Sequence, residues 1–310
     1  MSGYRETALL FEAGDARLVG IVTRPASNAP ARLGVLIVVG GPQYRVGSHR
    51  QFVQLARALA ARGFAAMRFD CSGMGDSTGA ERPFTDRDRD IRAAIDAFSA
   101  TVPEVGEIAI WGLCDAASAA LFYASQDARV KKLVLLNPWV RSEGGLARTH
   151  LKHYYAARLG DREFWRKLLG GEVGIVRALR GLGSTLLRAL AGSARDAGSK
   201  SDRGSDVSGP GPGFQARMAR GWKRFGGDIL LICSGDDLTA REFVDHVAGD
   251  AEWKGLVEQM RVARCDFAEA DHTFSRAAWR GQVETWTADW LADAAHMRHK
   301  LPASASRELA

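Results

Sequence analysis

The sequence predicts an α/β protein built on a mostly parallel β-sheet that is flanked by helices. Short runs rich in Val, Ile and Leu alternate along the chain with longer segments whose apolar residues recur at helical spacing. Several of these runs are apolar without interruption, as expected of strands buried on both faces of a sheet. Residues with reactive side chains directly follow several runs, at the strand ends where parallel sheets gather their active sites.

The first predicted elements are two N-terminal strands in TALLFEAGDARLVGIVTRP, joined by a hairpin turn at Gly14 and Asp15. A buried strand, RLGVLIVVGG, follows them. Residues 49–62 then carry apolar side chains at helical spacing, and Gly63 ends this helix. The next strand, FAAMRFD, leads into the glycine-rich loop CSGMGDSTG.

The alternation continues with a helix at about 85–100, the strand EIAIWG, a helix of small residues after Cys114, and the strand KKLVLLN. The sheet pattern resumes much later with GDILLICSGDD and RVARCDFAEADHTF. A final helix at about 276–297 is expected to pack back on the sheet.

Between residues 138 and 225 the strand–helix alternation stops, and the chain becomes helical, basic and aromatic. A glycine- and serine-rich stretch within it, about 191–213, is not expected to order. Because the sheet pattern resumes afterwards, we interpret 138–225 as a helical cap inserted between two strands. The predicted core therefore comprises 1–137 and 226–300, and 301–310 form a loose tail.

The composition is that of an ordinary globular protein, with 46% hydrophobic and 25% charged residues among 310. No apolar run is long enough to cross a membrane, and the N-terminus lacks the pattern of a secretory signal. The four cysteines follow neither a disulfide nor a metal-ligand spacing. We therefore expect a cytoplasmic protein that binds no metal and no cofactor.

Positive charge is concentrated in the predicted cap. Residues 141–225 contain 17 Lys and Arg against 7 Asp and Glu, whereas the whole chain has 42 and 36 and a net charge of +6. This excess favours an anionic substrate or an acidic membrane surface, and a solvated arginine-rich surface is the alternative. The cap segment VGIVRALRGLGSTLLRALAG places apolar residues opposite arginines, which suits peripheral membrane contact or packing on the core. No nucleic-acid partner is expected.

The segment Gly112-Leu113-Cys114-Asp115-Ala116 has the form of a nucleophile elbow, a tight turn between a strand and a helix. Such a turn needs small residues two positions before and two after the nucleophile. Cysteine becomes nucleophilic when a base or a helix N-terminus favours its thiolate. Cys114 is therefore the candidate nucleophile, and a small buried core residue is the alternative.

The partners of a nucleophile in this architecture follow it in the order acid, then histidine. The turn SGDD ends a buried strand and offers Asp236 and Asp237, of which we prefer Asp237 because Asp236 can serve as the turn residue. DHTF places His272 just after the next strand. Cys114, Asp237 and His272 thus form the candidate catalytic triad.

An oxyanion hole requires two backbone N–H donors. One is expected to be the N–H of Asp115, directly after the nucleophile. The other should come from the loop GGPQYRVGS, where Pro42 has no N–H, so Gln43 is preferred and Gly41 is the alternative. His49, which opens a helix beside this loop, and Trp139 are candidate substrate contacts.

The glycine-rich loop FDCSGMGDSTG raises the question of phosphate binding, because such loops cradle phosphates after strands. It lacks the lysine of a P-loop and the full dinucleotide fingerprint. We interpret it as a tight structural connection near the site.

The run VVGGPQYRVGSHRQFVQLARALAARGFAAMRFDCSGMGDSTG resembles the oxyanion loop, helix and D-x-x-G-x-G-x-S portion of α/β-hydrolases. The elbow, SGDD and DHTF match the remaining landmarks of that family in order. More narrowly, GGPQYRVGSHRQF, GLCDAASAA and LLNPWVR are similar to the hydrolase 1 group associated with the exosortase A system. This resemblance implies a link to bacterial exopolysaccharide production and cell-surface protein sorting.

Cysteine in place of the usual serine is a departure from most α/β-hydrolases. Members with cysteine at the elbow include dienelactone hydrolases and polyester synthases, so the resemblance leaves both hydrolysis and acyl transfer open. Our prediction is a hydrolase acting on an ester or thioester of an anionic acyl donor, such as a coenzyme A or carrier-protein thioester. The alternatives are an acyltransferase with the same triad and a non-catalytic scaffold that binds a partner or a membrane surface.

Overall fold

A computed structural model of the chain describes residues 3–26, 30–41, 43–141 and 213–292. Internal contacts divide the chain into two units, Met1–Val140 with Ser208–Ala310, and Arg141–Val207. All elements below belong to the first unit. The predictions for the cap helices, for the flexible stretch up to residue 212 and for the tail lie outside the described residues.

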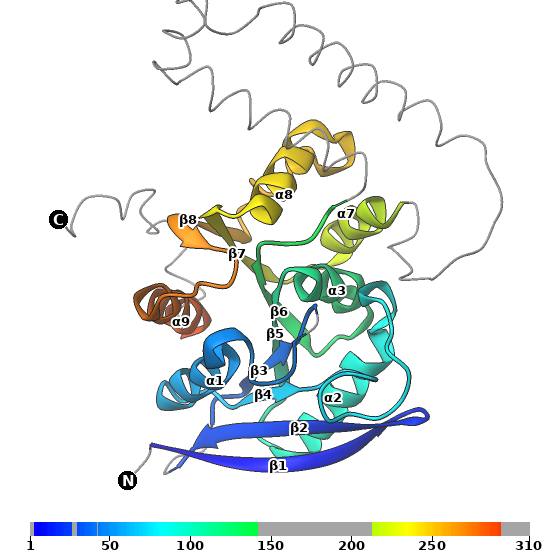
Figure 1. The fold of residues 1–310 in the computed structure, drawn as a ribbon, viewed down its shortest axis with the longest axis vertical. Coiled ribbons are helices and arrows are strands. Elements are labelled where there is room, and N and C mark those ends of the chain that lie inside the picture. The colour runs from blue at the N-terminus through cyan, green and yellow to red at the C-terminus, as the bar shows by residue number, and fades with distance from the viewer. Residues whose placement is uncertain (1–2, 27–29, 42, 142–212, 293–310) are drawn as a thin grey trace, which may run out of the picture. The chain divides into compact units, whose positions relative to one another are not determined.

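The core of the first unit is an eight-stranded sheet in the order β1-β2-β4-β3-β5-β6-β7-β8 (Figure 1). The strands are β1 (Tyr4–Ala13), β2 (Ala16–Pro25), β3 (Leu33–Val38), β4 (Ala66–Phe69), β5 (Glu107–Leu113), β6 (Val130–Leu136), β7 (Asp228–Asp236) and β8 (Val262–Asp271). β2 pairs antiparallel with both β1 and β4, and all other neighbours are parallel. The predicted mostly parallel sheet is therefore confirmed.

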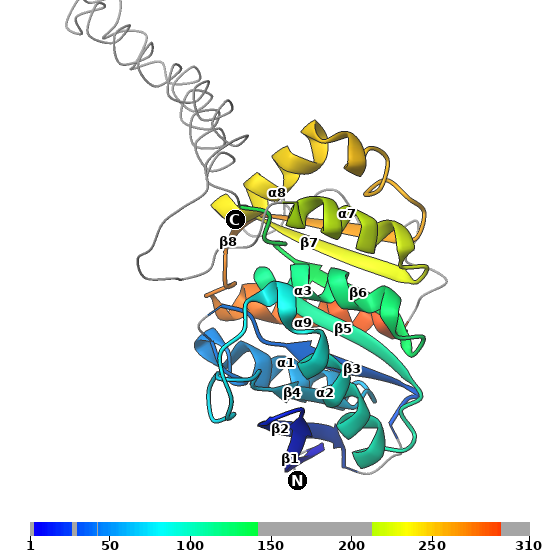
Figure 2. The ribbon, with the colours of Figure 1, turned by 90° about the vertical axis from the view of Figure 1, so that its right-hand side faces the viewer.

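Helices cover both faces of this sheet (Figures 1 and 2). α1 and α9 pack on each other on one face, whereas α2, α3 and α7 lie on the other. The helices are α1 (Gln51–Ala61), α2 (Asp88–Thr101), α3 (Asp115–Tyr123), α7 (Phe214–Arg224), α8 (Leu238–Gly249) and α9 (Ala277–Ala292). Short 3₁₀ turns occur at Ser48–Arg50, Phe84–Asp86, Ala124–Gln126 and Ala251–Trp253.

The continuous apolar runs of the sequence became the buried centre of the sheet. Every residue of β3 and of β4 is buried, and β6 is buried at all positions but Lys131. Continuous burial of this kind is what distinguishes a strand covered on both faces from a half-exposed one. β1, at the sheet edge, is instead mostly exposed.

The N-terminal hairpin is confirmed, with Ala13 paired to Ala16 and Gly14 at φ 67° in the turn. The helix expected from residue 49 begins later, at Gln51. His49 and Arg50 precede it with φ of 52° and 61°, in the left-handed region. The backbone therefore reverses sharply before α1 starts, which the apolar spacing alone did not indicate.

α7 falls in the segment that the sequence assigned to the cap, yet it packs on α3 in the core. A Cβ on Gly221 would lie 2.1 Å from the carbonyl oxygen of Leu121, so glycine allows the two helices to approach closely. Trp222 is fully buried, and its ring meets that of Trp253 edge-on at 5.5 Å. Its indole N–H donates to the carbonyl of Leu256 at 3.1 Å. These contacts group α7 with the sheet.

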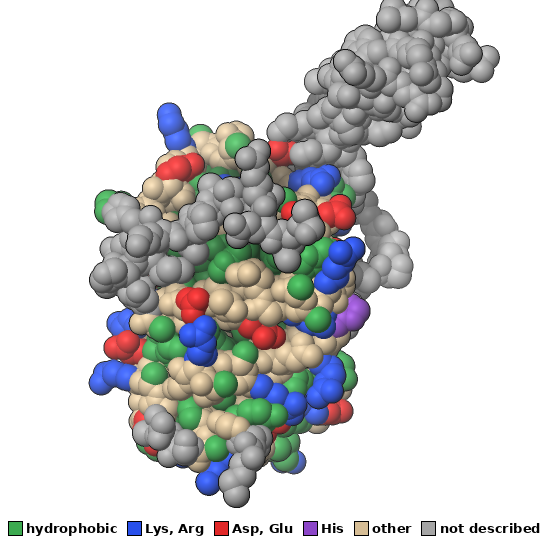
Figure 3. Space-filling model, turned by 90° about the vertical axis from the view of Figure 1, so that its left-hand side faces the viewer, with side chains coloured by type: hydrophobic (Ala, Val, Ile, Leu, Met, Phe, Trp, Pro, Cys, Tyr) green, Lys and Arg blue, Asp and Glu red, His purple; other side chains and the backbone are tan. Residues whose placement is uncertain are grey.

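None of the helices in the described parts of the chain is long and apolar enough to cross a membrane. On the face shown in Figure 3, acidic and basic side chains are interspersed with small hydrophobic areas.

Candidate active site

A strained turn connects β5 to α3 at Cys114. The residue has φ 64° and ψ −125°, a conformation that costs on the order of 1–3 kcal/mol for a residue with a side chain. The turn is tight because a Cβ on Gly112 would lie 2.7 Å from the backbone of Ala116. The small residues that the sequence placed around Cys114 are therefore required by the backbone, which presents Cys114 at the tip of the strand.

Cys114 differs from the other cysteines in its exposure. All four lie in the described residues and none forms a disulfide, but only Cys114 is partly exposed. Burial raises the pKa of the Cys71, Cys233 and Cys265 thiols to about 12. These three thiols are therefore protonated and shielded at neutral pH, and Cys114 is the cysteine that a reagent or substrate can reach.

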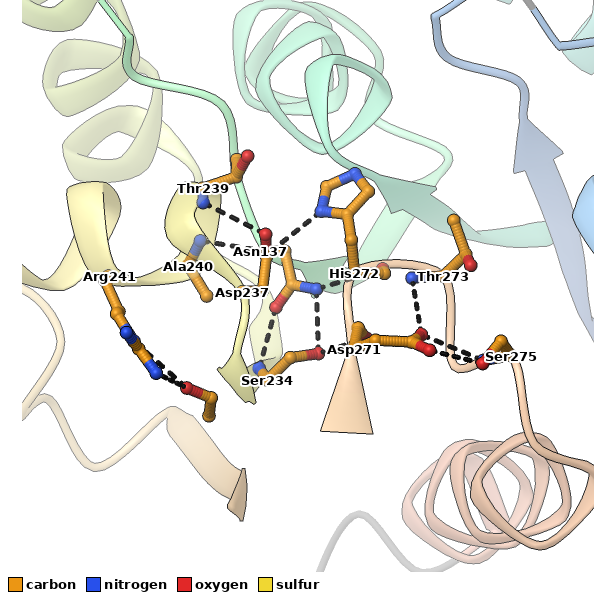
Figure 4. Close-up of polar contacts among 11 residues, drawn as sticks. Asn137, Ser234, Asp237, Thr239, Ala240, Arg241, Asp271, His272, Thr273 and Ser275 are labelled. Atoms are coloured by element: carbon orange, nitrogen blue, oxygen red, sulfur yellow. Dashed lines mark hydrogen bonds and ion pairs between the residues drawn. The ribbon is translucent and has the colours of Figure 1, made fainter. Parts of the chain in front are cut away.

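His272 and Asp237 form a hydrogen-bonded pair, with Nδ1 of His272 2.8 Å from Oδ2 of Asp237 (Figure 4). Asp237 caps α8 and accepts the backbone N–H groups of Thr239 at 3.0 Å and Ala240 at 3.1 Å. These bonds fix the carboxylate, which is largely buried, while the His272 side chain is 32% exposed. Asp236, the alternative acid, lies exposed at the end of β7.

Asn137, which the sequence analysis did not single out, joins the ends of three strands (Figure 4). Its fully buried side chain donates to the hydroxyl of Ser234 at 2.9 Å and to the carbonyl of His272 at 3.3 Å. Its Oδ1 accepts the N–H of Ser234 at 2.8 Å, and that hydroxyl donates to the carbonyl of Asp271. The only sequence signal for this role is an asparagine directly after the apolar run of β6.

The same strand end holds Cys114. The N–H of Cys114 donates to the carbonyl of Leu136 at 2.9 Å, and its carbonyl accepts the N–H of Trp139 at 3.2 Å. Asn137 thus lies between two residues bonded to the Cys114 backbone, and its side chain bonds the His272 loop. The structure therefore brings all three predicted triad residues to one edge of the sheet.

The two candidate substrate contacts also lie at this edge. Trp139 is half-buried, and its carbonyl accepts the hydroxyl of Ser118 at 2.7 Å. His49 is exposed and near Asp271. Partial burial of Asp271 opposes a lower pKa, but hydrogen bonds from Ser275 and Thr273 and the field of His49 hold its pKa below the usual value.

The loop after β3 packs directly on the elbow. The N–H of Gly41 donates to both carboxylate oxygens of Asp115, at 2.8 and 3.0 Å. A Cβ on Gly40 would lie 2.1 Å from the same carboxylate. The Gly41 N–H, the predicted alternative to Gln43 as the second oxyanion donor, is therefore engaged by a side chain. The Gln43 side chain makes a bond within the loop: its oxygen accepts the N–H of Ser48 at 3.3 Å.

The glycine-rich loop after β4 is bonded to the loop after β3 through Asp70. Asp70 is fully buried, accepts the N–H of Arg45 at 2.6 Å and forms an ion pair with its guanidinium. It also accepts the N–H of Asp76 at 3.0 Å. Gly75, at φ 54°, allows this wrap because a Cβ there would lie 2.3 Å from the Asp70 carboxylate. The Asp70 carboxylate thus bonds protein groups of its own and the neighbouring loop, as expected of a structural connection.

Within the described parts of the chain, no cluster of three or more His, Cys, Asp or Glu side chains is arranged to hold a metal ion.

The sequence profile of the alpha/beta hydrolase family matches residues 35–304. The chain belongs to this family. Its eight-stranded sheet, its elbow after β5 and its acid and histidine after β7 and β8 fit that assignment. A comparison with curated protein sequences found no match.

Solved structures with the same fold include two esterases and a peptidase. The esterase Pf2001 of Pyrococcus furiosus has a TM-score of 0.60 and 13% identity, over 93% of this chain and 91% of that one. Est1E of Butyrivibrio proteoclasticus, with bound ferulic acid, has a TM-score of 0.58 and 14% identity, over 92% and 98%. The proline iminopeptidase of Mycobacterium smegmatis has a TM-score of 0.55 and 16% identity, over 93% and 98%. At these identities the similarity shows the fold.

Proposed function

We propose that the protein is an esterase-type hydrolase that cleaves an ester or thioester with Cys114 as the nucleophile. The observation that carries this proposal is the 2.8 Å hydrogen bond between His272 and Asp237, at the sheet edge where the elbow presents Cys114. A histidine oriented by a buried carboxylate, at the same end of the parallel strands as a strained and accessible cysteine, supports nucleophilic acyl chemistry.

In the proposed mechanism, Asp237 holds Nδ1 of His272, which leaves Nε2 for proton transfer. Nε2 accepts the Cys114 proton as the sulfur attacks the substrate carbonyl carbon and the carbonyl electrons move to oxygen. When the intermediate collapses, the bond to the leaving group breaks, and His272 returns the proton to that alcohol or thiol. Water then attacks the acyl-cysteine with His272 as base, and the acid and the Cys114 thiol are released.

The oxyanion is stabilised by two backbone N–H groups, those of Asp115 and Gln43. Asp115 directly follows the nucleophile at the start of α3. Gln43 is preferred over Gly41 because the Gly41 N–H already donates to the Asp115 carboxylate. In this proposal His49 and Trp139 contact the substrate; the bond from the Trp139 N–H to the Cys114 carbonyl and the proximity of His49 to Asp271 support this.

The finer part of the proposal concerns the acyl donor. The excess of Lys and Arg between residues 141 and 225 supports an anionic donor, such as a coenzyme A or carrier-protein thioester. The resemblance of GGPQYRVGSHRQF and GLCDAASAA to the exosortase-associated group supports a role in exopolysaccharide production, inside the cell.

The test is intact-protein mass spectrometry of the wild type, Cys114→Ala and His272→Ala after mixing with butyryl-coenzyme A. The uncharged butyryl thioester of N-acetylcysteamine serves as the matched substrate for charge, and Cys265→Ala is the matched control variant. We expect a transient acyl adduct on wild type and on Cys265→Ala, faster with the anionic thioester. The adduct should be lost in Cys114→Ala and at least about 100-fold slower to form in His272→Ala.

A chain whose Cys114 forms no adduct and reacts no faster with iodoacetamide than its buried thiols is a scaffold, and the proposal fails. Release of free butyrate identifies a hydrolase. Appearance of a butyryl ester only when a sugar or lipid alcohol is added identifies an acyltransferase and overturns the hydrolytic step.

A further inference from the structure

We infer that the Asp115 side chain, paired with the buried Arg87, is a positioning device that fixes the oxyanion loop on the nucleophile elbow. The inference rests on the proposed function and assigns Asp115 a second role. Its backbone N–H is the proposed oxyanion donor, whereas its carboxylate acts on the loop that supplies the other donor.

The carboxylate makes its contacts on one side of Gly40. Both of its oxygens accept the N–H of Gly41, at 2.8 and 3.0 Å. The carboxylate also lies against Gly40 itself, where a Cβ would come within 2.1 Å of Oδ1. The peptide group between Gly40 and Gly41 is thereby fixed to the first residue of α3.

Arg87 holds the other side of Gly40. Its guanidinium is 4% exposed, and one of its nitrogens donates to the carbonyl of Val39 at 2.6 Å. A second nitrogen lies 3.9 Å from Oδ2 of Asp115. The ion pair between Arg87 and Asp115 therefore holds both peptide groups that flank Gly40, one through its carbonyl and one through its N–H.

Charge explains why two ionised residues are used here. The carboxylate lies in the first turn of α3, where the helix dipole favours negative charge, and Arg87 compensates it further. Without Arg87 the carboxylate would place an uncompensated negative charge near Cys114 and the developing oxyanion. That charge would destabilise both the Cys114 thiolate and the oxyanion. With Arg87 in place, the carboxylate can hold the loop at a smaller electrostatic cost.

The consequence is that the Gly41 N–H points at a side chain, and the loop is fixed so that the next N–H along it, that of Gln43, supplies the donor. Asp115 thereby acts on the transition state through the loop. Loss of this contact should affect steps that build an oxyanion and spare steps that do not.

Two reactions of the same thiol separate these effects. Alkylation of Cys114 by iodoacetamide displaces iodide and builds no oxyanion, whereas acylation by butyryl-coenzyme A does. Both rates are measured on the wild type, Asp115→Ala and Asp115→Asn, with Asp15→Asn as control. Asp15 is an exposed carboxylate on the N-terminal hairpin that pairs with Arg89. The ratio of acylation to alkylation cancels any change in thiolate population, and the melting temperature of each variant is measured alongside.

We expect the ratio to fall at least about 10-fold in Asp115→Ala, by less in Asp115→Asn, which keeps one acceptor, and to stay constant in Asp15→Asn. An unchanged ratio, with or without a lower melting temperature, means that Asp115 is only structural and overturns the inference. If Asp115→Ala does not fold, Asp115→Asn decides by the same ratio. Wild type that alkylates but never acylates refutes the proposed function instead, so the two failures are distinct.

Discussion

Asp70 and Asp237 have the same chemistry and similar positions, yet they do different work. Each follows a buried strand of the parallel part of the sheet, and each is itself buried and accepts backbone N–H groups. The Asp70 carboxylate also pairs with the guanidinium of Arg45, which is mostly buried. The Asp237 carboxylate instead pairs with the ring of His272, which is partly exposed. The difference in the last partner separates a carboxylate that holds a loop from one that holds a histidine, the base of the proposed mechanism.

The largest effect is expected at Asp237. Asp237→Asn keeps the shape of the side chain but loses the negative charge that holds His272 in one tautomer and stabilises its cation. We expect acyl-enzyme formation to slow by about 10³-fold or more, measured by mass spectrometry with butyryl-coenzyme A. Asp236→Asn is the matched control, because Asp236 is exposed next to it in the chain. Equal losses in both variants would assign Asp237 no special role.

A large effect of another kind is expected at Asp70. Asp70→Asn leaves the mostly buried Arg45 with only the exposed Asp76 as an ionic partner. We expect the free energy of unfolding to fall by about 3 kcal/mol in urea titrations. The alkylation rate of Cys114 should change little at temperatures where the variant is folded. If Asp70→Asn unfolds with the free energy of the wild type, the comparison is contradicted, because Asp70 would then contribute little to the stability of the loop.

Asn137 should give an intermediate result, because it both holds neighbouring strand ends together, as Asp70 holds a loop, and bonds the His272 loop, as Asp237 bonds His272. Asn137→Ala leaves the Ser234 hydroxyl and N–H without their buried partner and releases the carbonyl of His272. We expect about 1–3 kcal/mol of lost stability together with a slower acylation step, because the His272 loop is less well held. Ser234→Ala removes one partner and should show a smaller loss in both measurements.

The smallest effect is expected at a second histidine–carboxylate pair, His246 with Asp250 at 3.7 Å. Burial lowers the pKa of His246, and the nearby Asp250 offsets this only in part. The folded state therefore binds a proton less readily than the unfolded state. The contribution to stability is present above the usual pKa of histidine, about 6.5, and is lost as pH falls below it. The pH dependence of the melting temperature should flatten slightly in His246→Gln, and a steeper profile would contradict this sign.

Local patterns in the sequence predicted the strands, most helices and the order of the three candidate catalytic residues. The tight turn at Cys114 requires small neighbours such as Gly112, and these are visible in the sequence. His272 is recognisable because it directly follows a strand. The partnership of Arg87 with Asp115 was not predictable, because the two come from different elements. An aspartate is ordinary at a helix start, and no neighbouring residue of Arg87 points to Asp115 as its partner.

Asn137 was missed for a similar reason. A single asparagine after an apolar run is ordinary in a turn, and its two partners, Ser234 and His272, lie 97 and 135 residues away in the chain. α7 was assigned to the cap because its basic composition resembles the preceding segment. Its packing depends on Gly221 and Trp222, whose partners Leu121 and Trp253 are distant in sequence.

The close contact of α7 with α3 has a consequence for how the chain can be altered. The side chain of Gln215, in the first turn of α7, donates to the carbonyl of Val140 at 3.3 Å, so the chain leaves the sheet layer and re-enters it at neighbouring points. Closing so short a gap needs only a few residues, and closure entropy grows slowly with length. The core is therefore expected to tolerate exchange of residues 142–212 for a short glycine–serine linker or for a segment from another protein. In this chain, a large segment can therefore be exchanged while the described sheet and the strand ends that carry Cys114, Asp237 and His272 stay unaltered in sequence.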